Sequence, residues 1–111
     1  MDKKIYKIHA EMCKVFTSPV RIEIINLLGE GKKTVSELIE LTGLNQPNVS
    51  QHLHVMKEKG IVIAEKQGNN VFYSLTNPKI SEAFEIMKEI LQDQLAETEK
   101  LYKSIKEEVA G

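Results

Sequence analysis

The stretch NQPNVSQHLHVMKEKG, residues 45–60, has the pattern of a short helix with one apolar and one polar face. Asn45 is a preferred N-cap residue, and Pro47 falls in the first turn, where its missing N–H leaves no helical hydrogen bond unmade. Gly60 is a typical helix terminator. The apolar side chains recur at helical spacing and form the face expected to pack inward: Val49, Leu53, Val55 and Met56.

The outward face of this helix is polar but carries no acidic residue from Gln46 to Lys57. An amphipathic helix has a polar outer face without any ligand, but a merely solvated face is usually rich in Glu and Lys. Gln and Asn can instead pair with adenine, and free N–H groups at a helix N-terminus attract phosphate. We therefore predict that the helix binds duplex DNA through these side chains: Gln46, Asn48, Ser50, Gln51, His54 and Lys57.

The residues before Asn45 predict three further helices. Thr34-Val35-Ser36-Glu37 is a capping box that opens a short helix ending at Gly43. Together with the helix after Asn45 it forms a helix-turn-helix unit, whose second helix enters the DNA major groove. Two earlier helices are indicated by the apolar spacing within residues 5–16 and by the N-cap Ser18 of the segment that follows.

A β-hairpin is predicted after Gly60. Residues 61–64 and 71–75 are rich in β-branched and aromatic side chains and flank Gly68-Asn69-Asn70, where Gly and Asn would supply positive φ angles. A hairpin in this position would be the wing of a winged helix. Lys66 and Asn69 lie within it, and we expect them to contact the DNA backbone or the minor groove.

The two ends of the chain predict a homodimer. From Pro78, with Asn77 as cap, the sequence reads as one helix of about 30 residues, which extends some 45 Å. A domain of this size cannot cover such a helix alone, so much of its apolar stripe must meet another chain. We expect the dimer interface to include apolar residues of the first and last helices: Ile5, Ile8, Met12, Ile80, Phe84, Met87, Leu91 and Leu95.

The predicted elements indicate mainly α structure with a small β-hairpin (α+β), and the length favours a single domain. The 111 residues divide into an N-terminal dimer helix (1–17), a winged-helix core (18–76) and a C-terminal dimerisation helix (77–111). Residues 1–79 hold eleven Lys/Arg against eight Asp/Glu, a net charge of +3, and residues 80–111 hold four against eight, a net charge of −4. A mildly basic body and an acidic tail fit a DNA-facing domain whose last helix points elsewhere.

The sequence also predicts a cytoplasmic protein with no membrane partner. No apolar run approaches the roughly 18 residues that span a bilayer. The charged N-terminus lacks the apolar core of a signal peptide. The single Cys13 is normal for a reducing compartment.

Several motifs follow one another between Met12 and Thr76: Phe16, Ser18-Pro19-Val20-Arg21-Ile22, Val35-Ser36-Glu37-Leu38, Asn48-Val49-Ser50-Gln51-His52-Leu53, Lys59-Gly60-Ile61-Val62 and Lys66-Gln67-Gly68-Asn69-Asn70-Val71-Phe72-Tyr73. With these motifs the chain resembles the ArsR family of metal- and stress-responsive repressors. This resemblance implies a homodimer that binds a palindromic operator, repression relieved by an inducer, and a dimer interface made by the first and last helices.

The metal sites of that family are not matched. One places Cys-x-Cys-Asp on the third helix, where this chain has Thr34, Ser36 and Glu37, and hydroxyls are not the soft ligands such a site needs. The other takes His from the last helix, and residues 78–111 contain no His. We therefore expect no metal and no cofactor, and the inducer stays unidentified.

His9 and Cys13 are the remaining candidates for a metal or thiol sensor. They lie four residues apart on one helical face, so a dimer could supply a His2Cys2 zinc site. The alternatives are a redox-responsive thiol and packing of Cys13 as a small hydrophobe, of which we favour packing.

Two other residues, His52 and Arg21, match the family motif. His52 lies beside the packed face, where a structural hydrogen bond is at least as expected as a DNA contact. Arg21 is expected to have a structural or phosphate-binding role.

A rival function stays open, although no nucleophile–base pair or phosphate loop indicates an enzyme. The alternative is a winged-helix protein-interaction module, which would favour apolar or acidic residues on the outward face and need no dimer.

Overall fold

The computed structural model describes residues 2–110 and contains helices with a small antiparallel sheet. Residues up to Ser81 form one compact unit, and residues from Glu82 onward form a second, so the two are described separately. In chain order the elements are α1 (Lys3–Lys14), a 3₁₀ turn η1 (Val15–Thr17), α2 (Pro19–Gly29), β1 (Lys33–Thr34), α3 (Val35–Thr42), α4 (Gln46–Glu58), β2 (Val62–Gln67), β3 (Asn70–Leu75) and α5 (Pro78–Ala110).

The core of the first unit lies among α2, α3, α4 and the start of β2. The predicted inward face of α4 is confirmed for Val49, Leu53 and Met56, which are buried with at most 1% of their surface exposed, whereas Val55 is only half-buried. Their partners in the core are also aliphatic: Val15, Ile24, Ile25, Leu28, Leu38, Ile61 and Val62. This packing holds α4 by one side and leaves the opposite side free for a ligand.

The predicted helix caps are confirmed. The Ser18 side chain accepts a hydrogen bond from the Arg21 amide at the start of α2. Thr34 and Glu37 form both halves of the capping box of α3. Gly43 ends α3 in the left-handed region, with φ of 72°, a conformation that glycine adopts without the steric cost of a Cβ.

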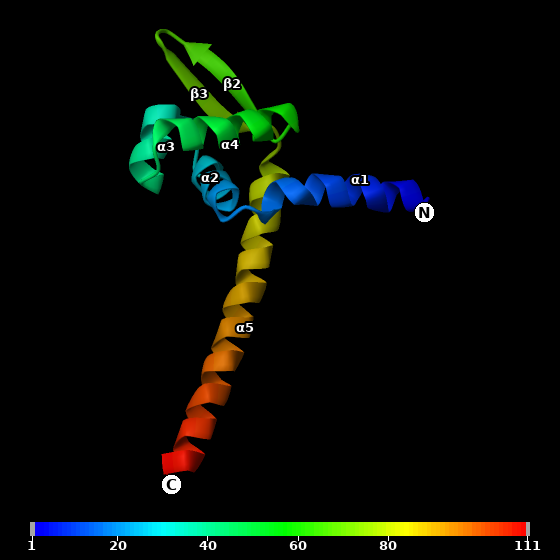
Figure 1. Cartoon of the computed structure of the whole chain (residues 1–111), viewed down its shortest axis with the longest axis vertical. Helices are drawn as coiled ribbons and strands as arrows, with labels where there is room; N and C mark the ends of the chain where they lie inside the picture. Colours follow the sequence, from blue (N-terminus) through cyan, green and yellow to red (C-terminus); the bar gives the residue numbers. More distant parts are fainter. Residues whose placement is uncertain (1, 111) are drawn as a thin grey trace. The chain divides into compact units, whose positions relative to one another are not determined.

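The sheet has three strands, in the order β1-β3-β2, where the sequence predicted only a hairpin. The hairpin itself is confirmed, with Val62 opposite Leu75 and Gln67 opposite Asn70. It projects away from the helices of this unit (Figure 1). The added strand is the two-residue β1, which pairs with β3. It is too short to show the alternation by which a strand is recognised in a sequence.

The turn of the hairpin corrects one expectation. Gly68 has a φ of 63°, but no non-glycine residue within residues 2–110 has a positive φ, so Asn69 and Asn70 do not share this conformation. Asn70 already belongs to β3, and the loop is therefore Gly68-Asn69. A two-residue loop of type II′ needs a positive φ at its first central residue only, which explains why one glycine suffices.

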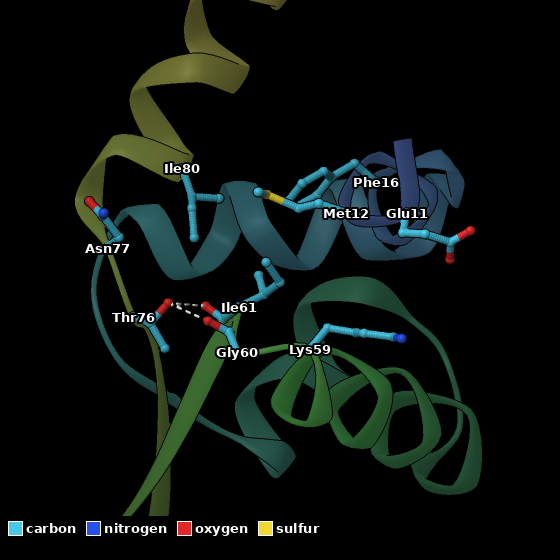
Figure 2. Close-up of a pocket in the computed structure, with 9 residues that line it drawn as sticks. All are labelled: Glu11, Met12, Phe16, Lys59, Gly60, Ile61, Thr76, Asn77 and Ile80. Carbon is cyan, nitrogen blue, oxygen red and sulfur yellow. Dashed lines mark hydrogen bonds between the residues drawn. The ribbon is translucent and has the colours of Figure 1, made fainter. Parts of the chain in front are cut away.

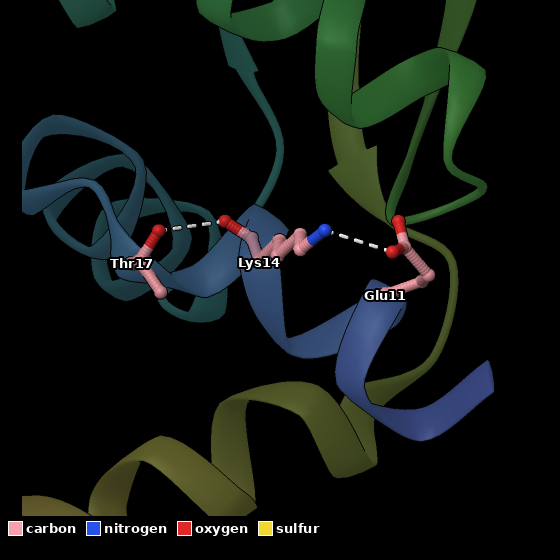
Figure 3. Close-up of polar contacts among 3 residues, drawn as sticks. All are labelled: Glu11, Lys14 and Thr17. Atoms are coloured by element: carbon pink, nitrogen blue, oxygen red, sulfur yellow. Dashed lines mark hydrogen bonds and ion pairs between the residues drawn. The ribbon is translucent and has the colours of Figure 1, made fainter. Parts of the chain in front are cut away.

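Helix α1 ends earlier than its apolar pattern predicted. The α-helix stops at Lys14, and residues 15–17 form the tighter turn η1. There the Thr17 hydroxyl donates a hydrogen bond of 2.8 Å to the Lys14 carbonyl, and Lys14 Nζ lies 2.8 Å from the Glu11 carboxylate (Figure 3). The hydrogen bond and charge of Lys14 hold the pKa of Glu11 below its usual value.

The predicted long final helix is confirmed as α5, which runs from Pro78 to Ala110. The Asn77 side chain accepts a hydrogen bond from the Lys79 amide at its start. Beyond Ser81 large apolar side chains are exposed, including Met87, Leu91 and Leu95. None of the helices within residues 2–110 is long and apolar enough to cross a membrane.

Candidate nucleic-acid interface

The outward face of α4 presents the side chains that the sequence predicted as DNA contacts. Five of the six are exposed: Gln46, Ser50, Gln51, His54 and Lys57. Asn48 is half-buried, whereas Gln51 is exposed. The fold thus brings these six residues to one side of the helix, and their contacts with DNA remain predictions.

The N-terminus of α4 offers fewer free N–H groups than expected for a phosphate. Asn45 Oδ1 accepts a hydrogen bond of 3.0 Å from the Asn48 amide, and Pro47 has no N–H. Among the first three residues of α4, Pro47 therefore has no N–H to offer and that of Asn48 is bonded to the N-cap, which leaves the N–H of Gln46. Side chains, rather than backbone amides, must therefore supply most of the binding capacity of this end.

His54 pairs with Glu58, a residue outside the predicted set. Its Nε2 lies 3.2 Å from a carboxylate oxygen of Glu58, one turn further along α4, and both side chains are exposed. An exposed pair of this kind is easily broken, since it contributes at most about 1 kcal/mol. A carboxylate nevertheless repels phosphate, so His54 is the least favourably placed of the predicted base contacts.

The wing brings together basic residues from two parts of the chain. Lys66 and Asn69 are exposed on the hairpin, as predicted. Lys32, which the sequence analysis missed, donates a hydrogen bond of 2.8 Å to Gln67 Oε1, and its Nζ lies 4.8 Å from the centre of the Phe72 ring. Because Lys32 precedes β1, it reaches the hairpin only through the pairing of β1 with β3.

Arg21 and His52 form a contact between α2 and α4. Arg21 Nε donates a hydrogen bond of 3.2 Å to His52 Nδ1, and its Nη1 lies 3.5 Å from the Val15 carbonyl oxygen, to which it donates. Burial, followed by the charge of Arg21, lowers the pKa of His52 below its usual value. The structural hydrogen bond considered for His52 is therefore present.

The expected dimer residues of α1 lie on an exposed apolar face. Ile5 is 48% exposed, Ile8 67% and Met12 49%. Met12 also borders a cavity of about 510 Å³ within the first unit, which Ile80 at the beginning of α5 lines as well (Figure 2). The remaining lining residues are Glu11, Phe16, Lys59, Gly60, Ile61, Thr76 and Asn77.

The Cys13 side chain is exposed on α1 in the single chain, and its packing as a small hydrophobe stays a prediction. His9 is exposed as well. Within the part of the chain that the structure describes, no three His, Cys, Asp or Glu side chains are grouped as metal ligands would be.

Comparison with known proteins identifies the family. The family model described as "Bacterial regulatory protein, arsR family" matches residues 18–64. The HTH-type transcriptional regulator Rv0081 of Mycobacterium tuberculosis is 37% identical over 105 residues, which cover 90% of this chain and 92% of that protein. The crystal structure of Rv0081 has a TM-score of 0.77 at 36% identity and covers 85% of this chain and 95% of that one.

Two further relatives have the same fold. The transcriptional repressor BigR from Xylella fastidiosa has a TM-score of 0.69 at 31% identity, covering 81% of this chain and 96% of its own. The homodimeric winged helix-turn-helix domain Mb0332 from Mycobacterium bovis has a TM-score of 0.74 at 24% identity, covering 86% and 90%. The chain therefore belongs to the arsR family of bacterial regulatory proteins and is a winged helix-turn-helix transcriptional regulator.

Proposed function

We propose that the protein is a homodimeric repressor that binds a palindromic operator in duplex DNA and is released by an inducer. The observation that carries this proposal is the outward face of α4, which is polar and free of acidic residues from Gln46 to Lys57. Buried Val49, Leu53 and Met56 hold the helix by its opposite side. In a helix-turn-helix protein such a face enters the major groove.

The base contacts and the backbone contacts come from different elements. Gln46, Asn48, Ser50, Gln51 and His54 would meet base edges, since their amide, hydroxyl and imidazole groups form directional hydrogen bonds. The positively charged Lys57 and Lys66, together with Asn69 and the added Lys32 beside the wing, would meet phosphates or the minor groove. Helix α4 would then read the base sequence of the operator, and the contacts of the wing would set the affinity for DNA.

The homodimer rests on apolar faces that this single chain leaves exposed. On α5 these are Met87, Leu91 and Leu95, and the stripe continues through Tyr102, Ile105 and Val109. Soluble monomers rarely expose contiguous apolar surface of this extent. We place the interface on α1 and α5, at Ile5, Ile8, Met12, Ile80, Phe84, Met87, Leu91 and Leu95. The related domain Mb0332 is itself described as homodimeric.

The proposed inducer is a small molecule, with a thiol-reactive signal as the alternative. We propose a cytoplasmic regulator, without a bound metal or cofactor, that responds to a small molecule. A thiol-responsive repressor is the alternative, and the exposure of Cys13 favours it, because only an accessible thiol reacts with an oxidant.

Selection of binding sites from a pool of random duplexes tests the main proposal. We expect an enriched inverted repeat whose half-sites are centred one helical turn, about 34 Å, or a multiple of it apart. Binding to the enriched duplex should weaken steeply between 50 and 200 mM salt, on the order of a thousandfold for six or more phosphate contacts. No enriched sequence, together with salt-independent binding, would favour the protein-interaction module instead.

A further inference from the structure

The hydrogen bond between Arg21 and His52 defines the protonation state of the imidazole. A guanidinium has donors only, so the acceptor, Nδ1 of His52, must carry no proton. The imidazole is therefore neutral, and its proton is on Nε2. Arg21 also donates to the Val15 carbonyl, so the same guanidinium joins α2, the turn η1 and α4.

We propose that Arg21 and neutral His52 form a positioning pair that holds α4 in the orientation that reads DNA, and that protonation of His52 releases it. Operator binding would therefore weaken in acid. The inference rests on the proposed function, since α4 must be the element that reads the operator. His52 lies between the outward Gln51 and the buried Leu53, so a displacement of its ring acts on the reading face.

Protonation removes the contact in two ways. A proton on Nδ1 leaves two donors facing each other at 3.2 Å, and it places a second positive charge beside the guanidinium. Among the described residues, none of the ion pairs joins the His52 ring to a carboxylate. The charged residues of the neighbouring elements are exposed: Glu23 on α2, Glu37 and Glu40 on α3, and Glu65 and Lys66 on β2. Arg21 is the charge that acts on the imidazole.

The direction of the pH dependence follows from the lowered pKa of His52. The folded protein favours the neutral ring, so the contribution of the pair is complete above the ordinary histidine pKa of about 6.5. It is lost as the pH falls below that value towards the lower pKa of the folded state. Protonation of His52 would then weaken DNA binding in acid.

The His52→Asn variant provides the matched control. Asparagine Oδ1 can accept the bond from Arg21 Nε near the place of Nδ1, but it does not titrate. Operator affinity would be measured by fluorescence anisotropy at pH 7.5 and 5.5, at constant ionic strength. His9 and His54 gain charge in both proteins, so their effect cancels in the ratio of parent to variant. We expect that ratio to fall by at least about threefold in acid, within the limit of tenfold per pH unit for one proton.

Two further variants test the positioning role itself. Arg21→Lys keeps the charge but lacks the planar fork that serves two acceptors. His52→Ala removes the acceptor altogether. Both should lower the affinity for the operator at pH 7.5 more than that for random duplex. Circular dichroism and thermal unfolding at each pH establish that the variants are folded.

An NMR titration of the parent protein tests, without any variant, whether protonation of His52 is coupled to DNA binding. If protonation weakens DNA binding by a given factor, then DNA binding must raise the acid dissociation constant of His52 by the same factor, which lowers its pKa. The ring nitrogen shifts should also report the Nε2–H form. A pKa that is unchanged or raised in the DNA complex, or equal pH dependence of parent and His52→Asn, overturns the proposal. Failure of the parent to prefer the operator at pH 7.5 would instead overturn the proposed function.

Discussion

Replacing Gln51 by Ala should separate sequence reading from folding. Gln51 is exposed on α4, and its side chain takes part in none of the hydrogen bonds found between described residues. The substitution should therefore change the free energy of unfolding by no more than about 0.5 kcal/mol. If the amide pairs with a base edge, operator binding should lose about 1–3 kcal/mol, or roughly 5- to 150-fold in Kd.

The loss must be specific to the operator. Anisotropy titrations of the parent and Gln51→Ala, with operator and with random duplex at the same salt, give the ratio of specific to non-specific affinity. Asn26→Ala is the matched control, since it removes an exposed amide from α2. We expect Asn26→Ala to leave the ratio unchanged and Gln51→Ala to lower it.

One result would refute this reasoning. If Gln51→Ala and the corresponding Asn48→Ala both keep the ratio of the parent, then α4 does not read the bases. Because Asn48 is half-buried, its replacement can also affect folding, so the thermal unfolding of Asn48→Ala must be measured alongside. Specificity would then have to come from the wing.

Four other changes should give distinct outcomes. Lys66→Ala should weaken binding to operator and random DNA alike and lower the salt slope by roughly one, which titrations at several salt concentrations measure. Removal of residues 78–111 should abolish the homodimer and with it operator binding; a full-length chain that sediments as a monomer at micromolar concentration would contradict this. Cys13→Ala should keep operator binding and the response to the inducer, whereas loss of a response to oxidant or zinc in a folded variant would support the thiol or metal alternative. Leu53→Ala, at a side chain 1% exposed, should lower the free energy of unfolding by about 2–5 kcal/mol in a denaturant titration.

Most of the candidate site could be predicted because its signals are local. The caps at Ser18, Thr34 and Asn45 work within three residues of the chain. The inward face of α4 follows from the helical period alone, and the outward face is what remains. The missing acidic residues on that face could be read from the same stretch of sequence.

The parts that could not be predicted depend on residues far apart in the chain. Lys32 and Gln67 are 35 residues apart, and Arg21 and His52 are 31 apart. No periodicity relates such residues, so their contacts exist only after the sheet and the helices have packed. The end of η1 at Thr17 has a different, local cause, since the residue before Pro19 is restricted to extended backbone and Ser18 adopts it, with ψ of 126°.

The sequence by itself determined which segments are helical, which side of each faces the core and which side chains lie on the outward face of α4, because these properties depend on neighbours within one or two turns. Only the tertiary structure decided that β1 joins the sheet, that Lys32 belongs to the wing and that Arg21 binds the imidazole of His52. It did so because each of these contacts requires two distant backbones to be fixed within a few ångströms of each other by a common core.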